Sequence, residues 1–460
     1  MTFWIPSISK SDGPLYLGIA DAIAAAIESG ELADGARLPP QRSMAGALGI
    51  DYTTVSRAYA EAGRRGLVEG RVGQGTFVVR RPFGKPASQA ISAQVDLGMN
   101  VPPPIDDPAL VARMWRAFSE LEHTGGPELL RHYQPPGGTG ADRTAGMRWL
   151  SRRLPSLAVE RVLVCPGAQG AMLTAMGILA APGDTVLSEA LCYPGFRSLA
   201  AQLRLTVRPV AMDEEGVVPE DFDTACRRDR PKVLYCTPTL HNPTTATMSR
   251  ARREAIAEVA RLHGVPILED DAYAPLLTEP LPPLAALAPE LTYYVGGLAK
   301  SLAPALRIAY LATPDARTAA RIMGGIRATA TMASPLTAAL ATTWISDGTA
   351  DAVLLAIRAE AHARQAIAAS ILPPDMVQTH PDAFHVWLSL FEPWTRQEFA
   401  SRMRSTGIAT VTSDAFAVER PPEAVRLALG AAVSRSTLGE GLRIIADLLQ
   451  QSPAMSSVVV

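Results

Sequence analysis

The sequence predicts an α/β protein in which a small helical domain with a β-hairpin precedes a much larger domain of alternating strands and helices. Two observations support this organisation. The chain has 460 residues, which exceeds the usual size of one domain. The apolar pattern also changes, from a helical repeat before residue 80 to short apolar runs alternating with helical stretches after residue 96.

The composition is that of a globular protein. Hydrophobic residues make up 48% of the chain and charged residues 19%, which is too apolar for a disordered protein. No run of about 18 apolar residues occurs, so we expect no membrane span, and the first residues lack the apolar core of a signal peptide. The four cysteines show no C-x-x-C spacing. We therefore expect reduced thiols in a cytoplasmic protein, and we predict no metal site.

Residues 14–80 predict three helices followed by a hairpin. Apolar residues recur every four positions in the first helix and predict one buried face: Leu15, Ile19, Ile23 and Ile27. Residues 38–70 then predict two helices around a tight turn, in which Gly49 ends the first helix and Asp51 caps the second. The hairpin that follows alternates apolar and polar residues about a glycine-rich turn at 73–75, which suits a wing.

The last of these helices has the character of a DNA-recognition helix. Its first turns present polar and basic side chains outward: Tyr52, Thr53, Ser56 and Arg57. Between residues 37 and 81 eight arginines oppose three acidic residues, whereas residues 10–36 hold one lysine and five acidic residues. A domain with one basic face is expected to bind phosphates. We therefore predict a double-stranded DNA operator as a partner.

Residues 14–79, PLYLGIADAIAAAIESGELADGARLPPQRSMAGALGIDYTTVSRAYAEAGRRGLVEGRVGQGTFVV, resemble the winged helix-turn-helix domain of GntR-superfamily regulators. The resemblance implies Arg42, Thr54, Arg57 and Gly75 as DNA contacts. With the neighbouring outward side chains, the predicted DNA-binding set is Arg42, Tyr52, Thr53, Thr54, Arg57, Arg71 and Gly75. Tyr52 stands where many members carry a basic residue, which alters the expected base preference but not the binding.

Residues 81–95 are rich in Pro, Gly, Ser and Ala and predict a linker. Beyond it, four predicted strands each lead into a segment with groups that can bind a ligand or react with it. These segments are the small-residue turn at 166–171, Asn242, Asp270 with Tyr273, and Lys300 with Arg307. Ligands of open α/β sheets bind at the carboxyl ends of the strands. The bare N–H groups of the helix that follows the first strand form an anion site. We therefore predict one site with an anion cradle, an amide, a carboxylate and an amine.

This set of groups is what pyridoxal 5′-phosphate requires. Lys300, one of only four lysines, stands among apolar residues, which favours a free amine able to form a Schiff base. The further predicted roles are an acid against the ring nitrogen for Asp270, bonds to the ring hydroxylate for Tyr273 and Asn242, phosphate binding for Arg307, and ring stacking for Tyr193. Taken singly, each residue has an ordinary structural explanation, so the prediction depends on their joint order and spacing.

Residues 96–450 resemble class I aminotransferases of fold type I, and the whole chain resembles MocR-type regulators, which join a GntR-like domain to an aminotransferase-like domain. The expected domains are 1–80, the linker 81–95, and 96–460. The resemblance implies a large mixed sheet flanked by helices, a small C-terminal α+β subdomain, and a homodimer. The cofactor residues that it implies are Lys300, Asp270, Asn242, Tyr273, Gly167, Ala168, Gln169, Arg307 and Tyr133, the last reaching the partner subunit's phosphate. Arg426 would bind the carboxylate of a substrate or effector.

Two positions depart from the family pattern. Gly297, three residues before the lysine, stands where a serine or threonine usually bonds the phosphate, which predicts weaker phosphate binding. Thr245 stands where a glycine usually follows N-P-T, which predicts a reshaped turn. Neither removes the Schiff-base chemistry.

Three functions remain open from the sequence. The chain is a transcription regulator whose cofactor senses a small amino acid or amine, an active aminotransferase that carries a DNA-binding domain, or a repressor with a vestigial cofactor site. We favour the regulator, because a complete winged helix serves no purpose in a metabolic enzyme. Residual transamination stays compatible with the intact catalytic residues.

Overall fold

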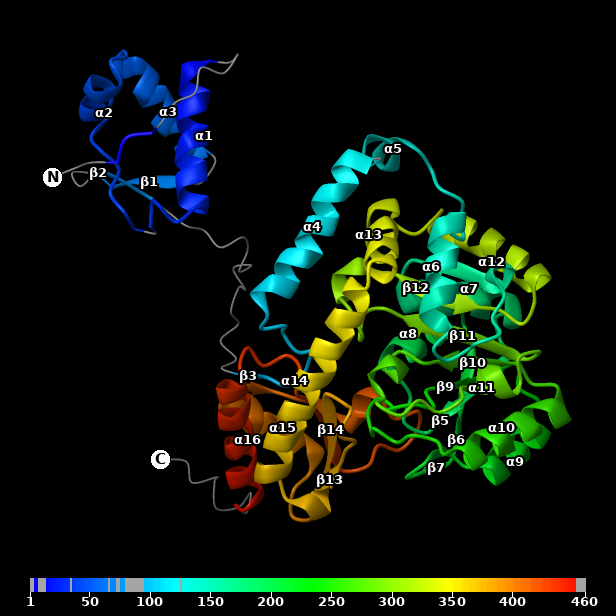
Figure 1. The fold of residues 1–460 in the computed structure, drawn as a ribbon. Coiled ribbons are helices and arrows are strands. Elements are labelled where there is room, and N and C mark those ends of the chain that lie inside the picture. Colours follow the sequence, from blue (N-terminus) through cyan, green and yellow to red (C-terminus); the bar gives the residue numbers. More distant parts are fainter. Residues whose placement is uncertain are drawn as a thin grey trace. The chain divides into compact units, whose positions relative to one another are not determined.

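The structure, a computed structural model, describes residues 4–6, 14–33, 35–64, 67–71, 75–78, 95–124 and 126–451. Contacts between Cα atoms divide the chain into two compact units, residues 1–91 and 92–460 (Figure 1). All of the predicted linker except residue 95 lies outside the described residues. The expected domain boundaries at 80 and 96 therefore stay predictions.

The first unit packs three helices and a hairpin around one small core. Its elements are α1 (Leu15–Glu28), α2 (Gln41–Leu48), α3 (Tyr52–Arg64), β1 (Val68–Arg71) and β2 (Gly75–Val78). The side chains of Ile19, Ile23 and Val55 are fully buried in this core. Leu15, which the sequence placed on the buried face, is 42% exposed. That expectation is wrong because Leu15 is the first residue of α1, and the core begins one turn later.

The second unit is built on a mixed seven-stranded sheet. Its strands, in spatial order, are β4 (Val162–Cys165), β12 (Ala309–Ala312), β11 (Thr292–Gly297), β10 (Ile267–Asp270), β9 (Leu234–Cys236), β5 (Thr185–Glu189) and β6 (Thr206–Val210). Strand β12 is antiparallel to both neighbours and the other pairs are parallel. The carboxyl ends of six strands therefore share one edge of the sheet.

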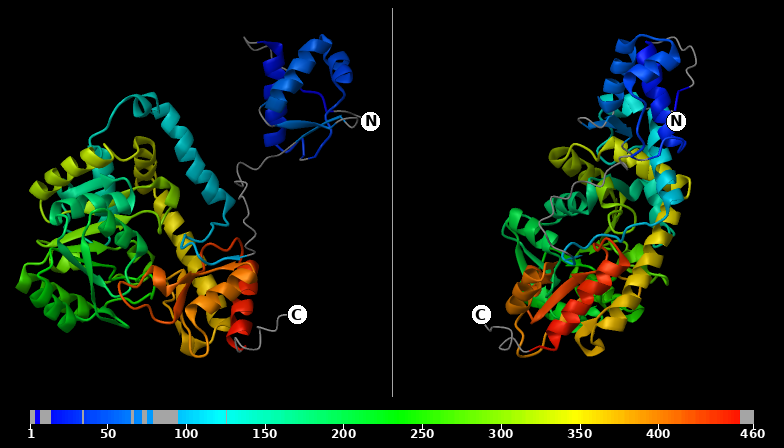
Figure 2. Two further views of the ribbon diagram at one scale, coloured as in Figure 1. Left: turned by 180° about the vertical axis from the view of Figure 1, so that it is seen from behind. Right: turned by 90° about the vertical axis from the view of Figure 1, so that its left-hand side faces the viewer.

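Helices cover both faces of this sheet (Figures 1 and 2). Neighbouring residues of β4 enter different cores, since Leu163 packs on one face and Val164 on the other. The core on the Leu163 face includes side chains from α7 (Gly167–Leu179), α8 (Pro194–Gln202) and α12 (Ala316–Thr329). The opposite face packs against α6 (Gly140–Leu150), α10 (Arg250–His263) and α13 (Pro335–Ser346). Because both faces are covered, β4, β9, β10, β11 and β12 are buried at every residue, whereas the edge strand β6 exposes Thr206 and Arg208.

The long helix α14 (Thr349–Ile371) leads from α13 to a smaller subdomain (Figure 1). The antiparallel sheet of this subdomain has the order β13 (Val377–Gln378), β14 (His385–Ser389), β17 (Ala424–Ala428) and β16 (Val411–Thr412). It lies with α15 (Arg396–Ser405) and α16 (Arg435–Leu449), and β3 (Val95–Asp96) pairs with β15 (Ile408–Ala409). The predicted α/β fold with a small α+β subdomain near the C-terminus is confirmed.

The remaining helices and strands of the second unit are α4 (Pro108–Thr124), α5 (Gly126–Arg131), α9 (Pro219–Asp229), α11 (Leu284–Leu287), β7 (Met212–Asp213) and β8 (Gly216–Val217). Among the helices that the structure describes, none combines the length and the apolar character needed to cross a bilayer.

Candidate functional site

The predicted site residues meet at the carboxyl edge of the large sheet. Asp270 is the last residue of β10, Lys300 follows β11 by three residues, and α7 begins at Gly167 directly after β4. The charges of Arg426, Asp270 and Arg307 all act on the Lys300 amine. Asp270 ends β10, and Lys300 and Arg307 lie between β11 and β12 of the large sheet, whereas Arg426 comes from the small subdomain, so both subdomains contribute to the site.

Asp270 presents one unpaired carboxylate oxygen to the site. Its Oδ2 accepts a hydrogen bond from the Tyr235 hydroxyl at 3.0 Å, whereas Oδ1 is buried without a partner among the described residues. Burial raises the pKa of Asp270 to about 6, so the carboxylate is mostly ionised at neutral pH. The Tyr235 ring is itself held by stacking on Phe196, with 3.8 Å between ring centroids. A buried acceptor of this kind fits the N–H of a pyridinium ring.

Lys300 has the character of a nucleophilic amine. Burial, followed by the positive charge of Arg426, lowers its pKa to about 8, against the opposing influence of Asp270. With that pKa, about one amine in ten is unprotonated at pH 7, compared with fewer than about one in a thousand for an ordinary lysine. The Lys300 Nζ donates a hydrogen bond to the carbonyl oxygen of Asn100. It also lies 5.9 Å from the centroid of the Tyr273 ring.

Arg426 is prepared to bind a carboxylate. It lies on β17 with 7% of its surface exposed, and its guanidinium carbon stands 5.2 Å from the centroid of the Phe416 ring. Its Nη1 donates to the Oδ1 of Asn242 at 2.9 Å, and its Nη2 donates to the carbonyl oxygen of Gly98. The Nε has no partner in the described part of the chain. Because a guanidinium has five N–H groups, Arg426 retains donors for two carboxylate oxygens.

The start of α7 forms the predicted anion cradle. Gly167 adopts a positive φ of 74°, and a Cβ at this position would lie 3.1 Å from the guanidinium carbon of Arg307. The backbone N–H groups of the first turn thus adjoin a cation, as phosphate binding requires. The side chain of Arg307 forms no hydrogen bond or ion pair with any described residue, so its donors remain available.

Gln169 and Tyr193 lie together beside this cradle. A Cβ at Gly195 would lie 2.0 Å from the amide nitrogen of Gln169 and 2.4 Å from the Tyr193 ring, so the two side chains approach the same point. Burial raises the pKa of Tyr193 above its ordinary value. With the unpaired oxygen of Asp270 and the cradle at Gly167, these groups fit a phosphorylated pyridine aldehyde.

Two predicted residues contribute nothing visible to the site within this chain. Tyr133 is 84% exposed, on the segment between α5 and α6, so its predicted role toward a partner subunit stays a prediction. Thr245 keeps the left-handed backbone that a glycine would adopt, with φ 64°. The threonine adopts an unfavourable conformation there, and the predicted reshaping of the turn stays a prediction.

Two further residues contact the site and were not predicted. The Asn100 Nδ2 donates to the Tyr273 hydroxyl at 2.8 Å, and Tyr235 holds Asp270. Tyr235 lies in the apolar run of β9, where its strand position alone signals only core packing. Asn100 precedes the large sheet by about 60 residues, and no local pattern connects it with Lys300.

The candidate DNA-binding surface lies on the first unit. Arg42, Tyr52 and Gly75 line a hollow of about 410 Å³ together with Arg37. Arg37 was not predicted. A Cβ at Gly75 would lie 2.8 Å from the Arg37 Nε, so the arginine occupies the space beside the bare glycine of the hairpin. The side chain of Arg71 and the turn at 72–74 lie outside the described residues.

The recognition helix α3 is braced at its first turns. The Thr53 hydroxyl and backbone N–H both donate to the Oδ1 of Asp51, the latter at 2.7 Å, as the predicted helix cap requires. The guanidinium of Arg57 lies 4.3 Å from the centroid of the Tyr16 ring on α1. Arg57 and Thr53 remain exposed and Thr54 is partly exposed, so all three stay candidates for DNA contact.

Two family models match the chain. The model described as aminotransferase class I and II matches residues 92–445, and the model of bacterial regulatory proteins of the gntR family matches residues 15–78. The predicted combination of domains is thereby confirmed.

Similar full-length proteins share both parts. The chain is 28% identical to the uncharacterized HTH-type transcriptional regulator YdeF of Bacillus subtilis, over 97% of this chain and 96% of that protein. It is 27% identical to PtsJ, the vitamin B6 salvage pathway transcriptional repressor of Salmonella typhimurium, over 91% of this chain and 95% of that protein.

Solved aminotransferases share the fold of the second unit. LysN, an α-aminoadipate aminotransferase from Thermus thermophilus, was solved with N-(5′-phosphopyridoxyl)-L-leucine and superposes with a TM-score of 0.70, covering 80% of this chain and 94% of that one at 22% identity. A kynurenine aminotransferase from Pyrococcus horikoshii, with a TM-score of 0.71 and 20% identity, covers 80% of this chain and 93% of its own.

Proposed function

The chain belongs to the aminotransferase class I and II family and is a transcriptional regulator with a gntR-type domain, and from that premise we propose that it binds pyridoxal 5′-phosphate covalently at Lys300 and senses a small amino acid. Family membership confirms the prediction of pyridoxal phosphate as the cofactor. The observation that carries the proposal is the convergence of a low-pKa lysine, a half-paired buried aspartate and two arginines in one site.

The roles proposed for the residues follow from their contacts. Lys300 would supply the amine that holds the cofactor covalently through its aldehyde, with loss of one water. When bound, the cofactor supplies an electron-withdrawing ring, and Asp270 would hold a proton on the ring nitrogen. Gly167, Gln169 and Arg307 would bind the phosphate.

Arg426 supports an effector that bears a carboxylate as well as an amine. Its free donors can bind two carboxylate oxygens, while Asn242 fixes the guanidinium through Nη1. Lys300 would be the group that the amine of the effector replaces on the bound cofactor, which would leave the Lys300 amine free. For this exchange to regulate transcription, the protein must have two conformations that bind DNA differently, and the effector must bind these two conformations with different affinities.

We further propose a homodimer in the cytoplasm, where the DNA target is found. Helix α4 presents a row of apolar side chains to solvent, including Val111, Trp115 at 61% exposure and Phe118 at 49%. Leu130 on α5 and Tyr133 continue this exposed face along the chain. A second copy of the chain would cover it, because apolar patches of this kind mark protein contacts.

The experiment that tests this function measures cofactor and DNA binding on the full-length protein. Absorbance after addition of pyridoxal 5′-phosphate reports the covalent bond, and fluorescence anisotropy reports binding to the DNA upstream of its own reading frame. An amino-acid panel should shift the DNA affinity of the loaded protein and leave the Lys300→Ala variant unchanged. A vestigial site would give no absorbance band.

The second candidate function is an active aminotransferase. The joint presence of Lys300, Asp270 and Arg426 in one site favours it, because Lys300, once released, is placed to move a proton from the α-carbon of a substrate. Steady-state transamination with the same amino-acid panel separates the two functions. Turnover at ordinary enzyme rates without any change in DNA affinity would favour the enzyme.

A further inference from the structure

The segment that enters the second unit crosses the candidate cofactor site. We call residues 97–101 the entry segment. The backbone N–H of Leu97 donates to the carbonyl of Ala409 at 3.0 Å, and the N–H of Ala428 donates to the carbonyl of Leu97 at 2.7 Å. These bonds anchor the start of the entry segment on the small subdomain. From there the backbone continues toward Lys300.

The end of the entry segment is also held by a backbone contact. A Cβ at Gly430 would lie 1.9 Å from the carbonyl oxygen of Val101, so the two backbones are in direct contact. The turn that carries Gly430 is held by Arg364, which is 1% exposed and donates to the carbonyls of Leu429 and Ala432 at 2.7 and 2.8 Å.

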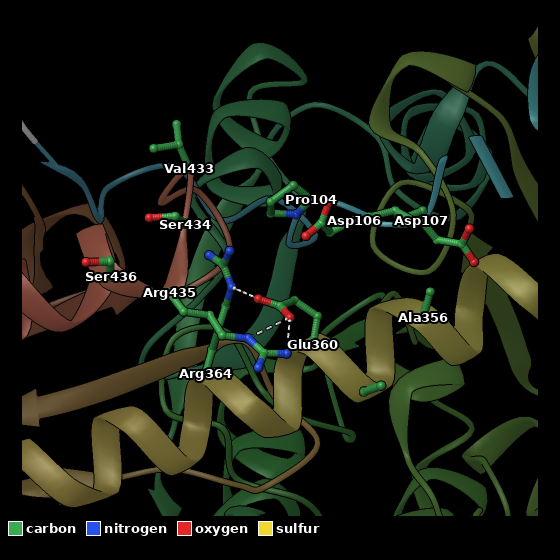
Figure 3. Close-up of a pocket in the computed structure, with 12 residues that line it drawn as sticks. Pro104, Asp106, Asp107, Ala356, Glu360, Arg364, Val433, Ser434, Arg435 and Ser436 are labelled. Atoms are coloured by element: carbon green, nitrogen blue, oxygen red, sulfur yellow. Dashed lines mark hydrogen bonds and ion pairs between the residues drawn. The ribbon is translucent and has the colours of Figure 1, made fainter. Parts of the chain in front are cut away.

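The Arg364 side chain is held in place by an ion pair with Glu360. It lies in a pocket of about 760 Å³, where Glu360 accepts hydrogen bonds from both Arg364 and Arg435 (Figure 3). Glu360 thus pairs with both arginines of this pocket, and Arg364 supports the turn that contacts the entry segment. Only the middle of the entry segment, between these two anchors, faces the site.

Asn100 uses both its backbone and its side chain in the site. Its carbonyl oxygen accepts a hydrogen bond from the Lys300 Nζ, and its Nδ2 donates to the Tyr273 hydroxyl at 2.8 Å. The side chain is 5% exposed, and its Oδ1 has no partner in the described ranges. One residue thus contacts the two groups that follow β10 and β11.

We propose that Asn100 is a positioning residue of this site, whose amide orients the Tyr273 hydroxyl and whose carbonyl oxygen receives the Lys300 amine. Because the Tyr273 hydroxyl accepts from Asn100, its own proton is free to be donated to a ligand oxygen. A free Lys300 amine has N–H groups for Asn100 and for other acceptors, whereas a covalently bonded Nζ carries at most one N–H, for which a ring hydroxylate would compete with the Asn100 carbonyl. The entry segment therefore gains or loses a contact according to what Lys300 binds.

This inference deepens the proposed function and rests on it. The entry segment directly follows the linker in the sequence, so a change at Asn100 occurs within a few residues of the connection to the DNA-binding unit. Sensing at Lys300 requires some element that differs between the free and bonded amine. The contact between Asn100 and Lys300 supplies that difference.

The test is a pH titration of the absorbance of the full-length protein loaded with pyridoxal 5′-phosphate. A donor to the ring hydroxylate stabilises the form with one proton fewer, so weakening the Tyr273 donor should raise the midpoint. In Asn100→Ala we expect a rise of about half a pH unit, or roughly threefold in proton affinity. Met99→Ala is the control, because Met99 is the adjacent residue and is 62% exposed.

A double-mutant cycle with Tyr273→Phe separates positioning from a general disturbance. Once the hydroxyl is absent, Asn100→Ala should add less than about 0.1 unit to the midpoint, because the two side chains act through one hydrogen bond. Equal shifts of Asn100→Ala and Met99→Ala, or additive shifts in the cycle, would overturn the proposal. Circular dichroism establishes that each variant is folded, and Tyr273→Phe alone still reports the hydroxyl if Asn100→Ala is unstable.

Two different results would contradict the proposed function and the role of Asn100. If the wild-type protein shows no covalent band with pyridoxal 5′-phosphate, the proposed function fails, and Asn100 has no such role. If the wild type is loaded but Asn100→Ala retains the wild-type midpoint, only the role of the Asn100 amide fails. Asn100→Ala keeps the backbone carbonyl that accepts from Lys300, so the expected result is a loaded variant with a raised midpoint and a wild-type change in DNA affinity on addition of amino acids.

Discussion

The guanidinium of Arg307 lies where a side chain at Gly167 would point, 3.1 Å from the position of its absent Cβ. Gly167 has a φ of 74° and opens α7, whose first N–H groups form the anion cradle. The absence of a side chain here has two physical causes, namely the left-handed backbone and the close approach of the arginine. Both favour glycine at the point where the phosphate of the cofactor would bind.

Gly167→Ala is expected to weaken binding of pyridoxal 5′-phosphate by about tenfold or more, because a Cβ at positive φ costs roughly 1–2 kcal/mol and also displaces Arg307. Equilibrium titration of the absorbance band measures this loss. Gly177→Ala is the matched control on α7, because its Cβ would meet nothing within 4 Å. Equal affinity of Gly167→Ala and the wild type would show that the cradle does not need this glycine.

The order of the strands in the sequence was enough to predict that Asp270 and Lys300 lie near each other. Asp270 and Lys300 lie at or just after the carboxyl ends of neighbouring strands, and parallel pairing fixes their proximity without further information. Arg426 was predicted from the alternation of apolar residues around it together with the family resemblance. Each prediction used a local pattern whose three-dimensional consequence follows from regular sheet geometry.

The contacts that the sequence did not reveal join segments with no regular geometric relation. Asn100 contacts Tyr273 across 173 residues and Lys300 across 200, through an irregular segment whose course depends on the small subdomain. Arg37 likewise approaches Gly75 only because the hairpin folds back on the loop before α2. Tertiary packing decides such contacts, and no periodicity of the sequence reports them.

The lowered pKa of Lys300 predicts a specific pH dependence of cofactor loading. Only the unprotonated amine attacks the aldehyde, so the loading rate should rise as the pH increases through about 8 and level off about one unit above it. A lysine of ordinary pKa, about 10.4, would give a rate that still rises at pH 9.5. Stopped-flow absorbance on the cofactor-stripped full-length protein measures this profile.

The lysine variants control for unspecific reaction of the aldehyde. Lys300→Ala should abolish the saturable phase, whereas Lys232→Ala should keep the wild-type profile, since Lys232 is exposed and lies before β9, away from the carboxyl edge. A profile that rises without a plateau would refute the depressed pKa. Loss of the phase in both variants would mean that the band does not report Lys300.

Gly297→Ser is expected to strengthen cofactor binding. A Cβ at position 297 would lie 3.5 Å from the Cβ of Ala168, which is ordinary van der Waals contact beside the anion cradle. The added hydroxyl would donate to the phosphate, and a hydrogen bond to a charged group contributes about 1.5–3 kcal/mol, or at least about tenfold in affinity. Gly297→Ala adds the same Cβ without the hydroxyl. If alanine tightens binding as much as serine, the hydroxyl makes no such bond.

Trp115→Glu should convert the proposed dimer into a monomer. Trp115 is 61% exposed and packs edge-on against Phe118, with 6.0 Å between ring centroids, and a charge at the centre of an apolar contact costs several kcal/mol when buried. Sedimentation equilibrium measures the change in mass. Leu262→Glu, on the exposed face of α10 at 73% exposure, is the control. A wild type that is already monomeric, or a dimeric Trp115→Glu variant, would contradict the assignment of this surface.

Thr245→Gly is expected to stabilise the second unit. Thr245 combines a φ of 64° with a buried Oγ1 that has no partner among the described residues, and each feature costs about 1 kcal/mol or more. Glycine removes both at the expense of about 0.5–1 kcal/mol of backbone entropy, so we expect the free energy of unfolding to rise by about 1 kcal/mol. Thr245→Ala removes the hydroxyl but keeps a Cβ at positive φ, and it should give a smaller gain in urea denaturation. If the alanine variant is as stable as the glycine variant, the backbone conformation carries no strain. If the glycine variant is less stable than the wild type, the threonine is preferred in this turn.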